Sequence, residues 1–132
     1  MENLTNSLQG RKKSPVRTTR ASKLFKTIIA AIQEKKGEAI VSLDLRKIDE
    51  AVADFFIVCE AQSYPQVRAI AEHVIEQVVR ECDEKPYHTE AGEHWTLIDY
   101  VNIVVHIFNR EHRKFYDLES LWLDAERMEH ND

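Results

Sequence analysis

The stretch WTLIDYVNIVVHIF, residues 95–108, decides the fold because it reads as two hydrophobic strands joined by a tight turn near residues 100–102. Side chains alternate between the two faces of a strand. Ile103, Val105 and Ile107 therefore share a purely aliphatic face, which we expect to pack under helices. The opposite face is predicted to look outward, and its members are Trp95, Leu97, Asp99, Asn102, Val104, His106 and Phe108.

This predicted outward face combines a large apolar patch with a few polar anchors. Exposed patches of that kind usually mark a partner-binding site. The competing interpretation is that Trp95 and Phe108 complete the core while Asp99 caps a turn, because aromatic residues are more often buried than at an interface. From the residues alone, both interpretations stay open.

The rest of the chain supplies the elements around this pair of strands. Ser63 and Gln66 form an S-x-x-Q capping box ahead of a continuous apolar stripe, which predicts a long helix. Apolar periodicity predicts helices over residues 22–36 and 63–79, strands over 38–45, 54–60 and 85–90, and a final short helix within 116–128. The order αββαβββα predicts a single α/β domain, with a mixed β-sheet flanked by helices.

Charge is distributed unevenly along the chain. Residues 1–20 carry five basic groups against one acidic group, a balance of +4, whereas the remaining 13 basic and 22 acidic groups give −9. We expect a disordered basic leader over residues 1–20, a folded domain over 21–126 and a flexible tail over 127–132. The leader either is simply solvated or makes a peripheral contact with an RNA polyanion.

Composition also indicates the cellular compartment in which the protein is expected. The two cysteines, Cys59 and Cys82, are far apart and form no C-x-x-C pair, so a reducing compartment is the simpler assumption. The sequence has no run of about 18 apolar residues and no apolar N-terminal segment. These features predict a cytoplasmic protein without a membrane partner.

Catalytic signatures are sparse. The six histidines show no H-x-x-x-H spacing, the three glycines are too scattered to form a phosphate cradle, and no G-x-S-x-G elbow occurs. One enzymatic alternative remains: a Mg²⁺-dependent nucleotidyltransferase in which the strand acids Asp44 and Asp99 hold the metal. Asp44 lacks a second acid two residues on, because Arg46 stands there. We therefore predict no catalytic residue, metal site or cofactor.

Five motifs in a fixed order resemble the ribosomal silencing factor family, also called Iojap-related proteins. They are DFFIV, S-x-x-QVRAIA, P-x-x-x-E, WTLIDY-x-x-IVVHIF and YDLESLW. The resemblance covers about residues 22–124. The sequence departs from the family's pattern at three turns. Glu60-Ala61 replaces a small Ser-Gly pair, Val101-Asn102 replaces Gly-Asp in the hairpin, and the connection Glu90-Ala91-Gly92 is shorter.

The resemblance implies a nucleotidyltransferase-like topology without the catalytic signature, and a role that is not enzymatic. It implies binding to the large ribosomal subunit through a ribosomal protein of the L-fourteen family. Occupying that site blocks joining of the small subunit and represses translation when nutrients are scarce. A homodimer is left open. By motif match, the partner-binding residues are expected to be Trp95, Leu97, Asp99, Tyr100, His106, Phe108 and Tyr116.

Overall fold

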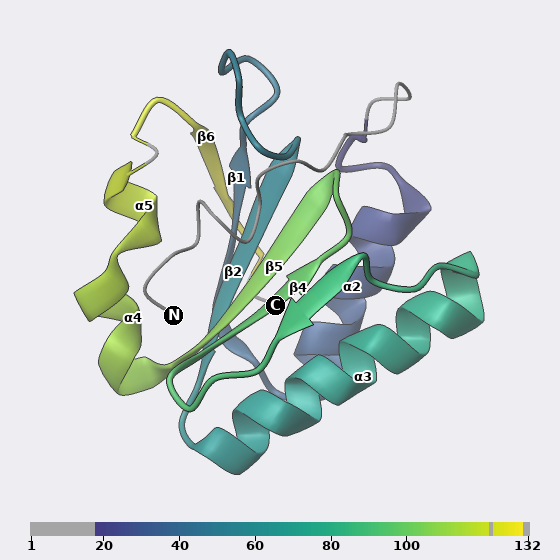
Figure 1. Cartoon of the computed structure of the whole chain (residues 1–132), viewed down its shortest axis with the longest axis vertical. Helices are drawn as coiled ribbons and strands as arrows, with labels where there is room; N and C mark the ends of the chain where they lie inside the picture. Colours follow the sequence, from purple (N-terminus) through teal and green to yellow (C-terminus); the bar gives the residue numbers. More distant parts are fainter. Residues whose placement is uncertain (1–17, 122, 131–132) are drawn as a thin grey trace.

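A six-stranded sheet, in the order β3-β4-β5-β2-β1-β6, organises the chain (Figure 1). The computed structural model describes residues 18–121 and 123–130, without the side chains of residues 115, 116 and 121. The elements are α2 (Lys23–Glu34), β1 (Glu38–Asp44), β2 (Phe55–Ala61), α3 (Tyr64–Cys82), β3 (His88–Glu90), β4 (Trp95–Asp99), β5 (Ile103–Asn109), α4 (Arg110–Tyr116), α5 (Leu118–Leu121) and β6 (Glu126–Glu129). The predicted single α/β domain with a mixed sheet flanked by helices is confirmed.

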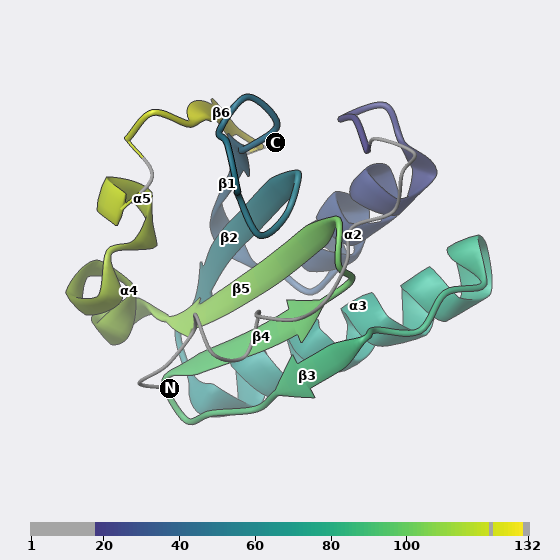
Figure 2. The same cartoon turned by 45° about the horizontal axis from the view of Figure 1, so that its top comes forward.

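The sheet is mixed because its two central strands run parallel. β2 pairs with β5 in parallel, and every other neighbouring pair is antiparallel. A parallel pair needs a crossover connection, and α3 provides the main part of it. Figure 2 shows α3 running beneath β3 and β4.

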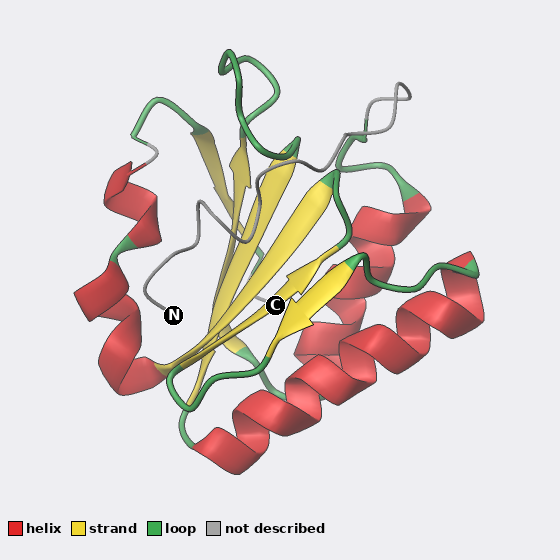
Figure 3. Ribbon diagram, viewed as in Figure 1, coloured by secondary structure: helices red, strands yellow, loops and turns green. Residues whose placement is uncertain are grey.

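Two long helices, α2 and α3, cover one face of the sheet, here called the helix face (Figure 3). Each buried aliphatic or aromatic side chain contributes about 1.5–3 kcal/mol, so this layer makes a large contribution to stability. The helical members of its core are Phe25, Ile28, Ala31, Ile32, Val67, Ile70, Ala71, Val74 and Val78.

α3 begins at the S-x-x-Q capping box that predicts it. The Ser63 hydroxyl accepts a hydrogen bond from the backbone N–H of Gln66 at 3.3 Å. The Gln66 side-chain oxygen accepts in turn from the backbone N–H of Gln62 at 3.0 Å, one residue earlier than in the usual capping box. The predicted helix start is confirmed.

The C-terminal part differs from the prediction. Residues 127–130 were expected in a flexible tail, but β6 pairs antiparallel with β1. His130 extends this attachment, since its backbone N–H donates to the Ile40 carbonyl at 2.8 Å and its Nε2 lies 2.8 Å from the Ser42 hydroxyl. All four residues of β6 are exposed. The sequence therefore lacks the apolar alternation from which a strand could be predicted here. Residues 131–132 of that tail, and residues 1–17 of the predicted leader, lie outside the described part.

The turn between β4 and β5 forms where it was predicted, at residues 100–102. The Tyr100 N–H donates to the Ile103 carbonyl at 2.8 Å, and the Asn102 N–H donates to the Tyr100 carbonyl at 2.8 Å. Val101, between them, has a φ of 70°. A β-branched residue is strongly disfavoured in that left-handed region, so this tight turn stores backbone strain.

Replacing Val101 by glycine should relieve that strain. We expect Val101→Gly to raise the free energy of unfolding by about 1 kcal/mol, because relief of a strained φ exceeds the entropic cost of glycine. Urea unfolding measures the change. Val101→Ala is the matched control, since it keeps a Cβ and should bring a smaller gain. Equal stability of the two variants would show that the backbone conformation is not the cause.

Candidate interaction face

The sheet face opposite α2 and α3, here called the Trp95 face, carries a second hydrophobic cluster. Its strand members are Val41, Leu43, Phe56, Val58, Trp95, Leu97, Val104 and Phe108. Within the described residues, Leu118 is the one helical member of this cluster. Among the described residues, the cover on this face is therefore lighter than the helix layer on the other.

Five of the predicted site residues meet on the Trp95 face. In the β4–β5 ladder Trp95 lies opposite Phe108, Leu97 opposite His106, and Asp99 opposite Val104. Directly opposed residues share a face of the sheet. The prediction that these side chains face away from the helices is confirmed.

Two predicted residues do not join this set. The Tyr100 ring packs in the cluster under α2 and α3, 4% exposed, so it lies on the helix face. The side chain of Tyr116 lies outside the described part of the structure.

The prediction that the Trp95 face is exposed is wrong. Trp95 is 4% exposed, and Leu97, Asp99, His106 and Phe108 are completely buried. Residues from outside the sheet pack into the same cluster, and they are Leu45, Ala51 and Ala53 from the β1–β2 connection and Leu118 from α5. The interpretation of Trp95 and Phe108 as core residues therefore describes this conformation. A partner can reach these side chains only if the face is uncovered.

Aromatic rings form the centre of the Trp95 face. Trp95 stacks on Phe108, with ring centroids 4.8 Å apart and 28° between the planes. Phe56 meets the His106 ring edge-on at 4.6 Å. Trp95 Nε1–H donates to His106 Nδ1 at 3.1 Å, a buried hydrogen bond that fixes the orientation of both rings.

The environment keeps His106 neutral. Burial lowers the pKa of its imidazole to about 3, because the charged form would lose its hydration. Since Nδ1 accepts from Trp95, the single ring proton is on Nε2. Nε2 is buried and has no hydrogen-bond partner among the described residues.

Polar groups at the turn end of the face anchor the hairpin to β2. Asp99 Oδ1 accepts from the Val101 N–H at 2.7 Å, so Asp99 does cap the turn. The Asn102 side-chain amide donates to Asp54 Oδ2 at 3.1 Å, and the Asn102 carbonyl accepts from the N–H of Asp54 at 2.8 Å. Sequence reasoning missed Asp54, although it directly precedes the buried strand DFFIVCE and could have been considered as a strand-end partner.

The geometry does not support the enzymatic alternative. Asp44 lies opposite Phe55 and so on the helix face, whereas Asp99 lies on the Trp95 face, on β4, which is separated from β1 by β5 and β2. Arg46 binds both oxygens of Asp44, at 3.0 and 2.7 Å, and these hydrogen bonds lower the pKa of Asp44. The two carboxylates do not converge on a common metal position. Among the described residues, no group of three His, Cys, Asp or Glu side chains could hold a metal ion.

An arginine clamp holds α4 and α5 against the sheet. Arg113, nearly buried, donates from Nη1 to the Ala39 carbonyl at 2.7 Å and to Glu60 at 3.1 Å, and from Nη2 to Glu119 at 3.3 Å. Arg110 donates to the second oxygen of Glu60 at 3.0 Å. Glu60, one of the residues that depart from the family pattern, is thus the anchor of α4. The Arg-x-x-Arg spacing is the signal that sequence reasoning overlooked.

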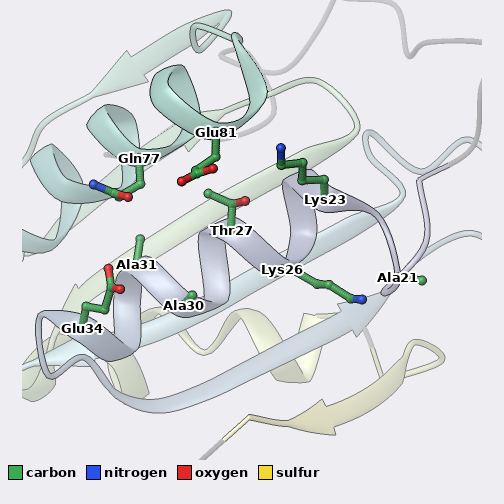
Figure 4. A pocket seen from close by; sticks show the side chains of 9 residues that line it. All are labelled: Ala21, Lys23, Lys26, Thr27, Ala30, Ala31, Glu34, Gln77 and Glu81. Atoms are coloured by element: carbon green, nitrogen blue, oxygen red, sulfur yellow. The ribbon is translucent and has the colours of Figure 1, made fainter.

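A groove of about 440 Å³ lies elsewhere, between α2 and α3 (Figure 4). Lys23, Lys26, Glu34 and Glu81 give it charges of both signs. None of the predicted site residues lines it. The groove therefore adds nothing to the Trp95 face, which is on the other side of the sheet.

Comparison with known proteins identifies relatives over most of the chain. The profile of the family described as "Ribosomal silencing factor during starvation" matches residues 18–132. A protein of Halalkalibacterium halodurans named ribosomal silencing factor is 38% identical over 108 residues, covering 80% of this chain and 91% of the relative. Its namesake in Bacillus subtilis is 36% identical over 107 residues, covering 77% and 86%.

A solved structure agrees with these relatives. A Chromobacterium violaceum protein superposes with a TM-score of 0.69 and 31% identity, over 75% of this chain and 82% of that one. In the described part of the chain, no helix is long and apolar enough to cross a membrane.

His106 should make stability depend on pH. Its folded pKa of about 3 lies below the unfolded value of about 6.5, so the unfolded chain binds the extra proton. The contribution of neutral His106 to the free energy of unfolding is complete above about pH 6.5. It falls by up to about 1.4 kcal/mol per pH unit as the pH is lowered. Urea unfolding between pH 7 and pH 4 should show a steeper loss for the wild type than for His106→Asn. Parallel curves would contradict the assignment of a neutral buried imidazole.

Proposed function

Because the chain belongs to the ribosomal silencing factor family, we propose that it binds the large ribosomal subunit through a ribosomal protein of the L-fourteen family. Occupying that protein blocks joining of the small subunit, so translation is repressed when nutrients are limiting. The factor acts by steric exclusion, without chemistry, and it works in the cytoplasm, where ribosomes are. The observation that carries the proposal is the family match over residues 18–132.

The Trp95 face is the proposed contact surface. The family motif WTLIDY-x-x-IVVHIF forms β4, the turn and β5, and it places Trp95, His106 and Phe108 together on that face. Large aromatic side chains with a polar neighbour are the usual energetic centre of a protein interface. Because these side chains are buried in the free chain, binding includes an opening step that exposes them.

The charge of the domain supports docking on protein in preference to RNA. Residues 21–132 carry a formal balance of −9, which disfavours close approach to ribosomal RNA. A basic ribosomal protein that protrudes from the RNA surface is attractive to the same domain. The basic leader, residues 1–20, provides a peripheral contact with RNA.

Sedimentation tests the proposed function. In a gradient of cell lysate, the protein should travel with free large subunits and be absent from joined ribosomes. Adding the purified protein to separated subunits should reduce the joined fraction. Co-sedimentation with small subunits, or no effect on joining, would contradict the proposal.

Trp95→Phe tests the contact surface without emptying the core. The variant keeps an aromatic ring against Phe108 but loses the indole N–H and part of the apolar area. We expect about tenfold weaker binding to purified large subunits, which is about 1.4 kcal/mol. Ile98→Val is the control, since Ile98 is on the same strand but in the helix-face cluster, and its affinity should not change. Equal affinity of both variants would show that Trp95 does not belong to the interface.

Deleting the leader tests its contribution separately. Removal of residues 1–20 takes away five basic groups. Affinity for large subunits should then fall, and its dependence on salt should become weaker, because fewer phosphate counterions are released on binding. Binding at two salt concentrations measures this. An unchanged salt slope would show that the leader does not touch RNA.

A further inference from the structure

A buried proton donor on the Trp95 face has no acceptor. The Trp95 indole N–H donates to His106 Nδ1, so the neutral imidazole carries its proton on Nε2. His106 is completely buried, and its Nε2 makes no hydrogen bond within the part of the chain that the structure describes. Native structures rarely leave a buried donor in this state, and each case calls for an explanation.

The direction of this donor suggests an external acceptor. A strand side chain stands roughly perpendicular to its sheet. Nε2 is on the far side of the imidazole ring from the backbone, so its N–H points away from the sheet. The other buried side-chain atoms without a partner among the described residues belong to Arg20, Tyr100 and His112, and they differ in this respect. Arg20 lies over the ring of Phe55, a member of the helix-face cluster. The Tyr100 hydroxyl lies under the helix layer, and His112 stacks on His94 at 3.6 Å, outside the cluster of the Trp95 face.

The described cover of the Trp95 face therefore buries His106 but offers no acceptor to its Nε2–H. Its non-sheet members, Leu45, Ala51, Ala53 and Leu118, contribute apolar side chains. A partner that places an acceptor over His106 would satisfy the donor that the free chain leaves unpaired. This difference favours the open, bound state over the closed, free state.

We propose that the Nε2–H of His106 is a recognition donor for the neutral carbonyl oxygen of an amide group, on the backbone or on an Asn or Gln side chain of the protein partner. This inference rests on the proposed function and names the chemistry of that contact.

A neutral acceptor fits better than a carboxylate. Asp99 is on the same face, two register positions along the ladder from the Leu97–His106 pair, and is completely buried. A second carboxylate beside it would be repelled and would also lose its hydration. An amide carbonyl carries no charge and accepts an N–H hydrogen bond well.

Two substitutions test the roles of the two ring nitrogens of His106 separately. His106→Asn can place its Oδ1 near the position of Nδ1 and accept from Trp95, but it has no donor at the position of Nε2. His106→Gln can place its amide N–H near the position of Nε2, but it leaves the Trp95 indole without its acceptor. The pair therefore distinguishes recognition of a partner from mere positioning of Trp95.

Affinity for purified, salt-washed large subunits and for the isolated L-fourteen-family protein provides the readout. We expect His106→Asn to bind about tenfold more weakly than the wild type, as for loss of one buried hydrogen bond. His106→Gln should stay within about threefold. Wild-type affinity in His106→Asn, or an equal loss in both variants, overturns the inference. If the wild type binds neither probe, the proposed function fails, and this inference fails with it.

A direct measurement covers the case in which a variant does not fold. In wild-type protein labelled with ¹⁵N-histidine, the Nε2 proton of His106 should shift downfield when the isolated ribosomal protein is added to saturation. An unchanged resonance in the bound state overturns the inference, since the proton would then have gained no acceptor.

Discussion

The structure depends on the parallel pairing of β2 with β5, because this pair is apolar on both of its faces. Phe55, Ile57, Ile103 and Val105 face one side, and Phe56, Val58, Val104 and Phe108 face the other. A sheet built around such strands must be covered on both sides. In the described part of the chain the two covers are unequal, with two long helices on one side and short segments on the other.

That inequality links the fold to the function. The helix face is a conventional core, whose cover is continuous with α2 and α3. The Trp95 face has the same burial, but the cover that the structure describes there comes from a connection and a four-residue helix. It also contains a neutral histidine with one unpaired nitrogen. A face that is buried but lightly covered can serve as core in the free protein and as an interface in a complex.

Much of this was predictable from local patterns, and the rest depends on tertiary contacts. The β4–β5 hairpin and α3 could be predicted because strict alternation and a capping box specify them within a few residues. β6 could not, since its exposed residues show no alternation and its position comes from pairing with β1. The burial of Trp95 and the clamp around Arg113 likewise depend on segments that are distant in sequence.

The central claim is that the Trp95 face is the surface that docks on the large ribosomal subunit. The most direct test is a cryo-electron microscopy structure of the protein bound to that subunit. The account predicts that β4 and β5 lie against the L-fourteen-family protein, with Trp95 and Phe108 in contact with it. A complex in which α2 and α3 contact the subunit while the Trp95 face stays covered would contradict it.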